Sequence, residues 1–333
     1  MDTTSAWVNR IGFLLILAAA GCLDPDEPGN LVAKTVVEDP TLPRIEVNGT
    51  VLHATTAGRA GNPVVMVLHG GPGADYRSML PLATLADDGY EVVFWDQRGS
   101  GLSQRHDFDS YTLDIALEDL RQVIDRYAVA ETPLVFIGHS WGAMYATWFI
   151  NSYGSYGGRI RGAVLSEPGA FTKAQLDAYI KRLSGSIDLF GRGLNDLCWA
   201  GQLMSPDDQA RADYLHMVAS TTGWPAEHND PAKPEPRFRD GAVVEAALLH
   251  LAKQGFDWTT NLKSFAPKVL FLRGDLNESN RLQDQQELAA SYANAEIVTM
   301  ANVGHDMIWE RPDEYLGHVR SYLQAIGFVG GAP

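Results

Sequence analysis

The chain has 333 residues, of which 41 are Asp or Glu and 26 are Lys or Arg, giving a formal net charge of −15. This balance argues against nucleic acid as a partner and against charge-driven adsorption to anionic lipid. The only cysteines are Cys22 and Cys198, so we expect no internal disulfide and interpret Cys198 as a small buried apolar residue. The sequence has no internal repeat and no metal-ligand spacing, and we expect no metal site.

The first residues predict an export signal. Arg10 supplies a positive charge, and the apolar run 11–20 is too short to span a bilayer. The small residues before Cys22 resemble a bacterial lipobox. That resemblance implies removal of residues 1–21, acylation of the Cys22 thiol and a lipid anchor in the bacterial cell envelope; an ordinary signal peptide is the alternative. Residues 22–43, rich in Asp and Pro, predict a flexible tether.

Uniformly apolar runs alternate with helical patterns after the tether. This alternation predicts one α/β domain with a mostly parallel sheet covered on both faces. We expect its core to comprise residues 44–167 and 263–327, starting with a β-hairpin around Asn48-Gly49. Residues 168–262 break the alternation, and we interpret them as a mainly helical cap. Strands are expected at 64–68, 90–95, 133–137, 161–165, 269–272 and 295–300, and helices at 79–87, 112–127, 141–153, 282–292 and 312–326.

The segment Gly138-His139-Ser140-Trp141-Gly142 lies between an apolar strand and a helical run. G-x-S-x-G in this context is typical of a nucleophile elbow, a tight turn between a strand and a helix. The turn needs nearly side-chain-free residues two before and two after the serine, and both are glycine. We therefore predict that Ser140 is a nucleophile, over the start of a helix whose dipole favours negative charge. A structural turn is the alternative.

The glycine-rich loop 69–73 follows the strand at 64–68. An acyl-transfer site needs two backbone N–H donors aimed at the developing oxyanion. We expect one from Trp141, the residue after the nucleophile. The other is expected from this loop, and Gly71 is the best candidate because Pro72 has no N–H. A plain turn is the alternative.

The loop 96–103 follows the next strand and reads D-Q-R-G-S-G-L-S. Its residue types demand no acid–base role. We expect a salt bridge from Asp96 or a neighbour to Arg98 that orders the loop.

A nucleophilic serine needs a base within hydrogen-bond reach. His305 lies in the loop between the last strand and the last helix, whereas His318 falls inside that helix. In α/β-hydrolases the triad follows the chain order Ser, acid, His. We therefore predict His305 as the base and interpret the remaining scattered histidines as surface or satisfied core residues.

The motifs H-G-G-P-G, D-Q-R-G-x-G-x-S and G-x-S-W-G resemble those of the proline iminopeptidase group of α/β-hydrolases, over about residues 44–327. The resemblance implies the α/β-hydrolase fold and a serine peptidase that releases an N-terminal residue from small peptides without a cofactor. It implies Ser140 as nucleophile, His305 as base, and the N–H groups of Gly71 and Trp141 as the oxyanion hole.

The chain departs from this group in the cap. The group usually carries W-x-x-W-E there, which contributes to recognition of the free amine, and residues 195–199 are only a faint echo of it. A carboxylesterase or lactonase of the same fold therefore stays open beside the peptidase. A catalytically silent cell-surface binding module is a remote alternative. The expected partner is a small molecule or a short peptide.

The acid of the triad departs from the usual position as well. That position, three residues beyond Gly274, is Asn277, and a neutral amide cannot stabilise the imidazolium. A carboxylate at the end of the strand at 161–165 is the other known location, and Glu167 lies there. Some haloalkane dehalogenases resemble this arrangement. We therefore predict that Glu167 accepts the Nδ1–H of His305; Asp275 and then Glu278 are the alternatives.

Overall fold

The computed structural model describes residues 32–186, 209–222, 230, 232–233 and 235–332. Its centre is an eight-stranded sheet in the order β1-β2-β4-β3-β5-β6-β7-β8. β2 pairs antiparallel with both β1 and β4, and the strands from β4 to β8 in this order run parallel. The strands are β1 (Arg44–Val47), β2 (Thr50–Ala57), β3 (Val64–Leu68), β4 (Glu91–Trp95), β5 (Leu134–His139), β6 (Ile160–Ser166), β7 (Val269–Gly274) and β8 (Ala295–Met300). The predicted fold class, hairpin and strands are confirmed.

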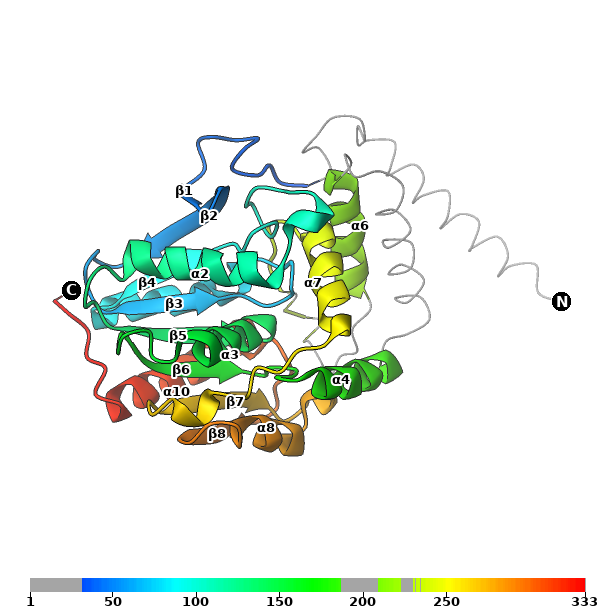
Figure 1. The fold of residues 1–333 in the computed structure, drawn as a ribbon. Helices are drawn as coiled ribbons and strands as arrows, with labels where there is room; N and C mark the ends of the chain where they lie inside the picture. The colour runs from blue at the N-terminus through cyan, green and yellow to red at the C-terminus, as the bar shows by residue number, and fades with distance from the viewer. Residues whose placement is uncertain (1–31, 187–208, 223–229, 231, 234, 333) are drawn as a thin grey trace.

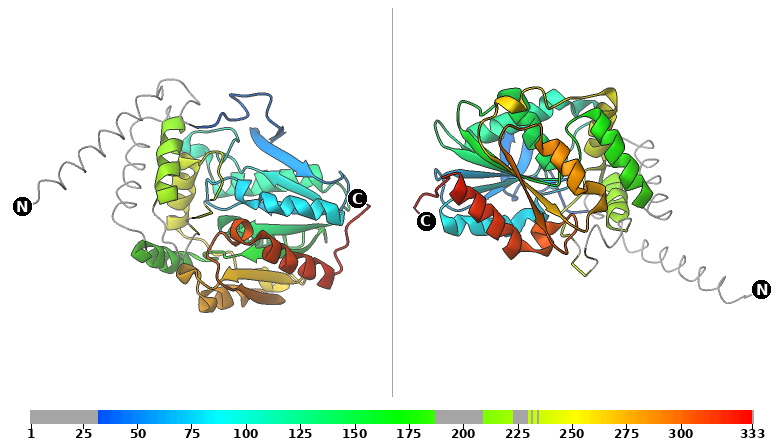
Figure 2. Two further views of the ribbon diagram at one scale, coloured as in Figure 1. Left: turned by 180° about the vertical axis from the view of Figure 1, so that it is seen from behind. Right: turned by 90° about the horizontal axis from the view of Figure 1, so that it is seen from below.

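Helices cover both faces of the sheet (Figures 1 and 2). Successive residues of a strand point to opposite faces, so each buried strand feeds two cores. Val65 and Val67 pack with η1 and α10, whereas Met66 and Leu68 pack with α2 and α3. The covering helices are η1 (Arg77–Asp88), α2 (Leu113–Tyr127), α3 (Trp141–Tyr153), α8 (Leu282–Ala289), α9 (Met307–Glu310) and α10 (Pro312–Ala325).

The described part of the segment between β6 and β7, where the sequence predicts the cap, contains three longer helices. They are α4 (Lys173–Ser186), α6 (Gln209–Thr222) and α7 (Ala242–Gln254), and they gather at one end of the sheet (Figure 1). No helix in the described part of the chain is both long and apolar enough to cross a bilayer. The predicted signal peptide, Cys22 and Cys198 lie outside the described residues.

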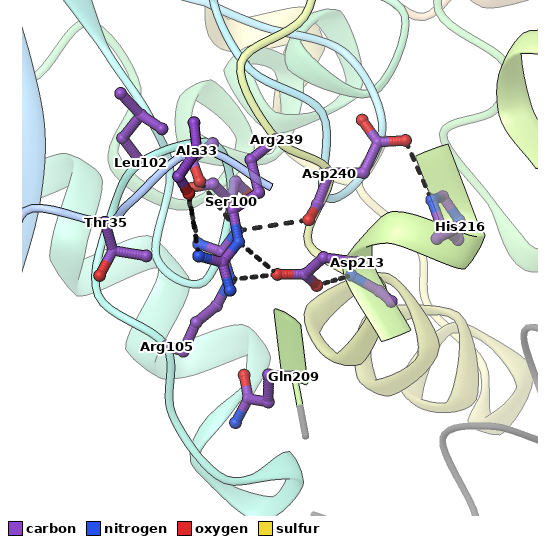
Figure 3. Close-up of polar contacts among 12 residues, drawn as sticks. Ala33, Thr35, Ser100, Leu102, Arg105, Gln209, Asp213, His216, Arg239 and Asp240 are labelled. Carbon is purple, nitrogen blue, oxygen red and sulfur yellow. Dashed lines mark hydrogen bonds and ion pairs between the residues drawn. The ribbon is translucent and has the colours of Figure 1, made fainter. Parts of the chain in front are cut away.

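Residues 32–43 are not the flexible tether that the sequence predicts. Val36 is fully buried, and its N–H donates to the Leu102 carbonyl at 2.8 Å. Nearby, the buried guanidinium of Arg239 donates to Ala33 O at 3.1 Å (Figure 3). It also lies 3.1 Å from a Glu38 carboxylate oxygen. The tether prediction is wrong for these residues, because specific contacts to distant parts of the chain fix a segment whose own composition favours flexibility.

Arg239, itself a residue of the insertion, also contacts the helix α6. Its Nε donates to Asp213 on α6 at 2.7 Å, and Arg105 donates to the same carboxylate oxygen at 3.0 Å (Figure 3). The other Asp213 oxygen accepts the backbone N–H of Ala242 at the start of α7. A buried guanidinium is tolerated only where its donors find acceptors. Arg239 therefore ties residues 33–38 to α6 and, through Asp213, to the start of α7.

Candidate active site

Ser140 lies at the junction between β5 and α3 in a turn that side-chain-bearing residues rarely adopt. Its φ is 53° and its ψ is −116°, and its backbone N–H donates to Ser166 O at 2.8 Å. A Cβ on Gly142 would lie 1.9 Å from the Leu68 carbonyl oxygen, and one on Gly138 would lie 2.6 Å from the Gly142 oxygen. Only glycine fits at either place, so the predicted strand–turn–helix geometry is present.

The loop after β3 lies against this turn. A Cβ on Gly70 would lie 3.4 Å from the Cβ of Ser140, and Gly71 has a φ of +117° that favours glycine. Trp141 is the first residue of α3, so its N–H has no acceptor inside the helix. The two expected oxyanion-hole donors, Gly71 and Trp141, therefore lie on the two segments that meet at Ser140.

Gln97, to which the sequence assigned no role, links these segments. Its amide nitrogen donates to His69 O at 3.0 Å, and its amide oxygen accepts the indole N–H of Trp141 at 2.9 Å. Its backbone N–H donates to His69 Nε2 at 3.0 Å. One buried side chain thus fixes the distance between the two segments.

His305 and Glu167 are in direct contact. His305 Nδ1 lies 2.6 Å from Glu167 Oε2, and Glu167 is fully buried. With the proton on Nδ1 donated to this carboxylate, Nε2 of the neutral imidazole is an acceptor. The contact expected between these residues is present. His139, the residue before Ser140, lies against His305: its Nε2 is 2.9 Å from the His305 carbonyl oxygen, and the two ring centroids are 4.5 Å apart.

The two alternative acids lie elsewhere. Asp275 and Glu278 are both exposed, and Asp275 accepts the backbone N–H of Asn302 at 2.7 Å. Asn277, at the usual acid position, is buried and donates its amide to Glu167 Oε2 at 2.5 Å. The structure therefore brings Glu167, and neither alternative, onto the histidine.

The pKa of His305 lies above its ordinary value of 6.5. Burial lowers it, but the hydrogen bond and charge of Glu167 and then the charges of Asp306 and Glu235 outweigh burial. Raised basicity suits a group that must take a proton from a hydroxyl.

The loop 96–103 is ordered by partners other than those expected. Arg98 pairs with Asp119 of α2 at 2.7 Å, whereas Asp96 lies 2.8 Å from His53 Nδ1 and accepts the Leu102 N–H at 2.9 Å. The predicted salt bridge from Asp96 or a neighbour in the loop to Arg98 is wrong, because Asp96 and Arg98 each meet a partner from another element. His53 is a satisfied core histidine, as expected.

The cap segment 237–241 is joined to the loop that carries Gly71. Gly241 N–H donates to Gly73 O at 2.6 Å, and Asp75 accepts the backbone N–H groups of Phe238 and Arg239. A Cβ on Gly241 would also lie 2.0 Å from the Gly99 carbonyl oxygen. The cap segment thus packs between both glycine-rich loops, a contact that no local pattern indicates.

Comparison with known proteins agrees with this geometry. The profile of the Alpha/beta hydrolase family matches residues 64–317. A proline iminopeptidase from Heyndrickxia coagulans is 42% identical over 280 residues, covering 80% of this chain and 92% of that protein. Proline iminopeptidase PfmaB from Pestalotiopsis fici is 26% identical over 300 residues, covering 84% and 98%. The enol-lactonase structure from Burkholderia xenovorans LB400 has a TM-score of 0.58 at 19% identity, covering 85% of this chain and 100% of that one.

Because the family profile runs from β3 into α10, over the whole parallel sheet, the chain belongs to the alpha/beta hydrolase family and is a hydrolase. Within that family it is proline iminopeptidase-like, as its full-length relatives show.

Proposed function

We propose that the protein hydrolyses its substrate through an acyl-enzyme on Ser140. His305 Nε2 takes the hydroxyl proton while Ser140 Oγ attacks the substrate carbonyl, and Glu167 stabilises the resulting imidazolium. The N–H groups of Gly71 and Trp141 bind the oxyanion. His305 then protonates the leaving group, and a water activated by the same histidine releases the acid. The contact of 2.6 Å between His305 and Glu167 is the observation that carries this proposal.

We further propose that the substrate carries a free N-terminal amine, as the names of the relatives suggest. Glu235 supports this reading. Its charge acts on His69, His139 and His305, the histidines around Ser140. Burial raises the pKa of Glu235, but the charge of Arg237 and a hydrogen bond from Ser78 outweigh burial, so the pKa is lowered and the carboxyl is ionised at neutral pH. An ionised carboxylate whose charge acts on the base can also attract an ammonium group.

Hydrolysis of a carboxylic ester or lactone is the second candidate. One observation favours it: Arg237 lies 2.7 Å from Glu235 and 2.9 Å from Asp240, so the Glu235 carboxylate already has a cationic partner. A neutral acyl substrate would leave this ion pair intact.

A substrate panel on the Glu235→Gln variant separates the two candidates. For aminoacyl arylamides we expect KM to rise about tenfold, because a charge-assisted hydrogen bond to the amine becomes a neutral one. KM for short acyl esters and lactones should stay at the parent value. The measurement is steady-state kinetics on both series with the parent and the variant.

Glu46→Gln, an exposed change on β1, is the matched control and should alter neither KM. If the parent hydrolyses esters but no arylamide, the protein is an esterase. An equal KM change for both series would show that Glu235 does not select the amine.

We also propose that the protein is exported and lipid-anchored at Cys22. The Cys22→Ser variant should lose membrane association and appear in the soluble fraction, because the acylated thiol is removed. Membrane fractionation with immunodetection measures this, with Cys198→Ser as the control that keeps the anchor. Equal membrane partitioning of Cys22→Ser and the parent would contradict the anchor.

A further inference from the structure

Three donors surround the buried carboxylate of Glu167. Oε1 accepts the backbone N–H of Gly274 at 2.8 Å, while Oε2 lies 2.6 Å from His305 Nδ1 and accepts the Asn277 amide at 2.5 Å. Each of these donors satisfies an acceptor position of the buried carboxylate. Oε2, the oxygen that faces His305, therefore has two donors, and the Asn277 amide is one of them.

Asn277 is itself held in one orientation. It is 2% exposed, and its Oδ1 accepts the Ser279 N–H at 3.1 Å, which turns the amide nitrogen toward Glu167. That nitrogen also lies 3.3 Å from His305 Nδ1. The histidine nitrogen therefore has a carboxylate oxygen and an amide nitrogen side by side in front of it.

We propose that Asn277 is a positioning residue of the His305–Glu167 pair, and that the carboxylate and the amide can be exchanged between positions 167 and 277. The proposal rests on the proposed function. In the Glu167→Gln/Asn277→Asp double variant, the new carboxylate takes the place of the Asn277 amide nitrogen and faces His305 Nδ1. The new amide at position 167 donates to it and still accepts the Gly274 N–H. The second oxygen at position 277 still accepts the Ser279 N–H.

The test is a four-protein cycle of the parent, both single variants and the double variant. The readouts are kcat on the best panel substrate and the rate at which a fluorophosphonate labels Ser140. Glu167→Gln should be slower by about 10⁴-fold, and the double variant should recover at least about 100-fold of that loss. Asp275 and Glu278 are present in all four proteins, so recovery would depend on the position of the carboxylate.

A double variant as slow as Glu167→Gln, with the parent's urea midpoint, would overturn the proposal. If the double variant does not fold, the Asn277→Ala variant tests the positioning role instead. Its kcat should fall at least about tenfold with KM unchanged, because the Glu167 carboxylate without its second donor is misplaced. A parental kcat in Asn277→Ala would overturn the proposal.

Failure of the proposed function itself would look different, because the parent would then be neither labelled nor active.

Discussion

Ser140→Ala is expected to abolish hydrolysis, with a loss in kcat of about 10⁶-fold, the scale seen when a triad serine is removed. The acyl-enzyme cannot form without the hydroxyl, and nothing else in the elbow can replace it. Removing a hydroxyl from the half-buried Ser140 leaves the backbone turn and both glycine contacts in place. The fold should therefore survive. The measurement is turnover of any substrate of the parent, together with fluorophosphonate labelling and circular dichroism.

Ser152→Ala is the matched control, because Ser152 is an exposed serine on the same helix, α3. It should keep parental turnover and labelling. Full activity in Ser140→Ala would refute the acyl-enzyme mechanism.

Glu167→Gln is expected to lower kcat by about 10⁴-fold, because an amide cannot stabilise the imidazolium and can hold the histidine in the wrong tautomer. The variant keeps the size of the side chain and an acceptor for the Gly274 N–H. The urea midpoint should therefore stay near that of the parent. Steady-state kinetics and urea unfolding measure the two effects.

Asp275→Asn is the matched comparison in the neighbouring loop. Its carboxylate caps a backbone N–H on the surface, so kcat should change less than about threefold, as expected for a surface substitution. The opposite ranking of the two variants would show that the acid has been assigned to the wrong residue.

The core could be predicted from the sequence because its signals are local. Each parallel strand is buried on both faces and therefore reads as an apolar run, as in Val64–Leu68. The elbow could be predicted for the same reason, since Gly138 and Gly142 are fixed by backbone contacts within the turn and with Leu68. The acid could be narrowed to three carboxylates by excluding Asn277, and the contact with His305 then distinguishes them.

Contacts between distant segments could not be predicted from the sequence. Arg98 pairs with Asp119, and Arg239 pairs with Glu38. No periodicity or motif in the sequence predicts either ion pair. Gln97 and Asn277 were missed for a related reason. Each is a neutral amide whose role comes only from the two groups it joins, and residue type alone does not indicate those groups.

The contacts of Arg239 bear on how the protein can be shortened for preparation. Removing the chain up to Arg44, where the first strand begins, would delete both Ala33 and Glu38. The guanidinium would then keep Asp213 but lose its other acceptors on a side chain that is only 2% exposed. An underpartnered buried cation destabilises a fold. A recombinant version should therefore start no later than Val32, even though the regular secondary structure begins well after it.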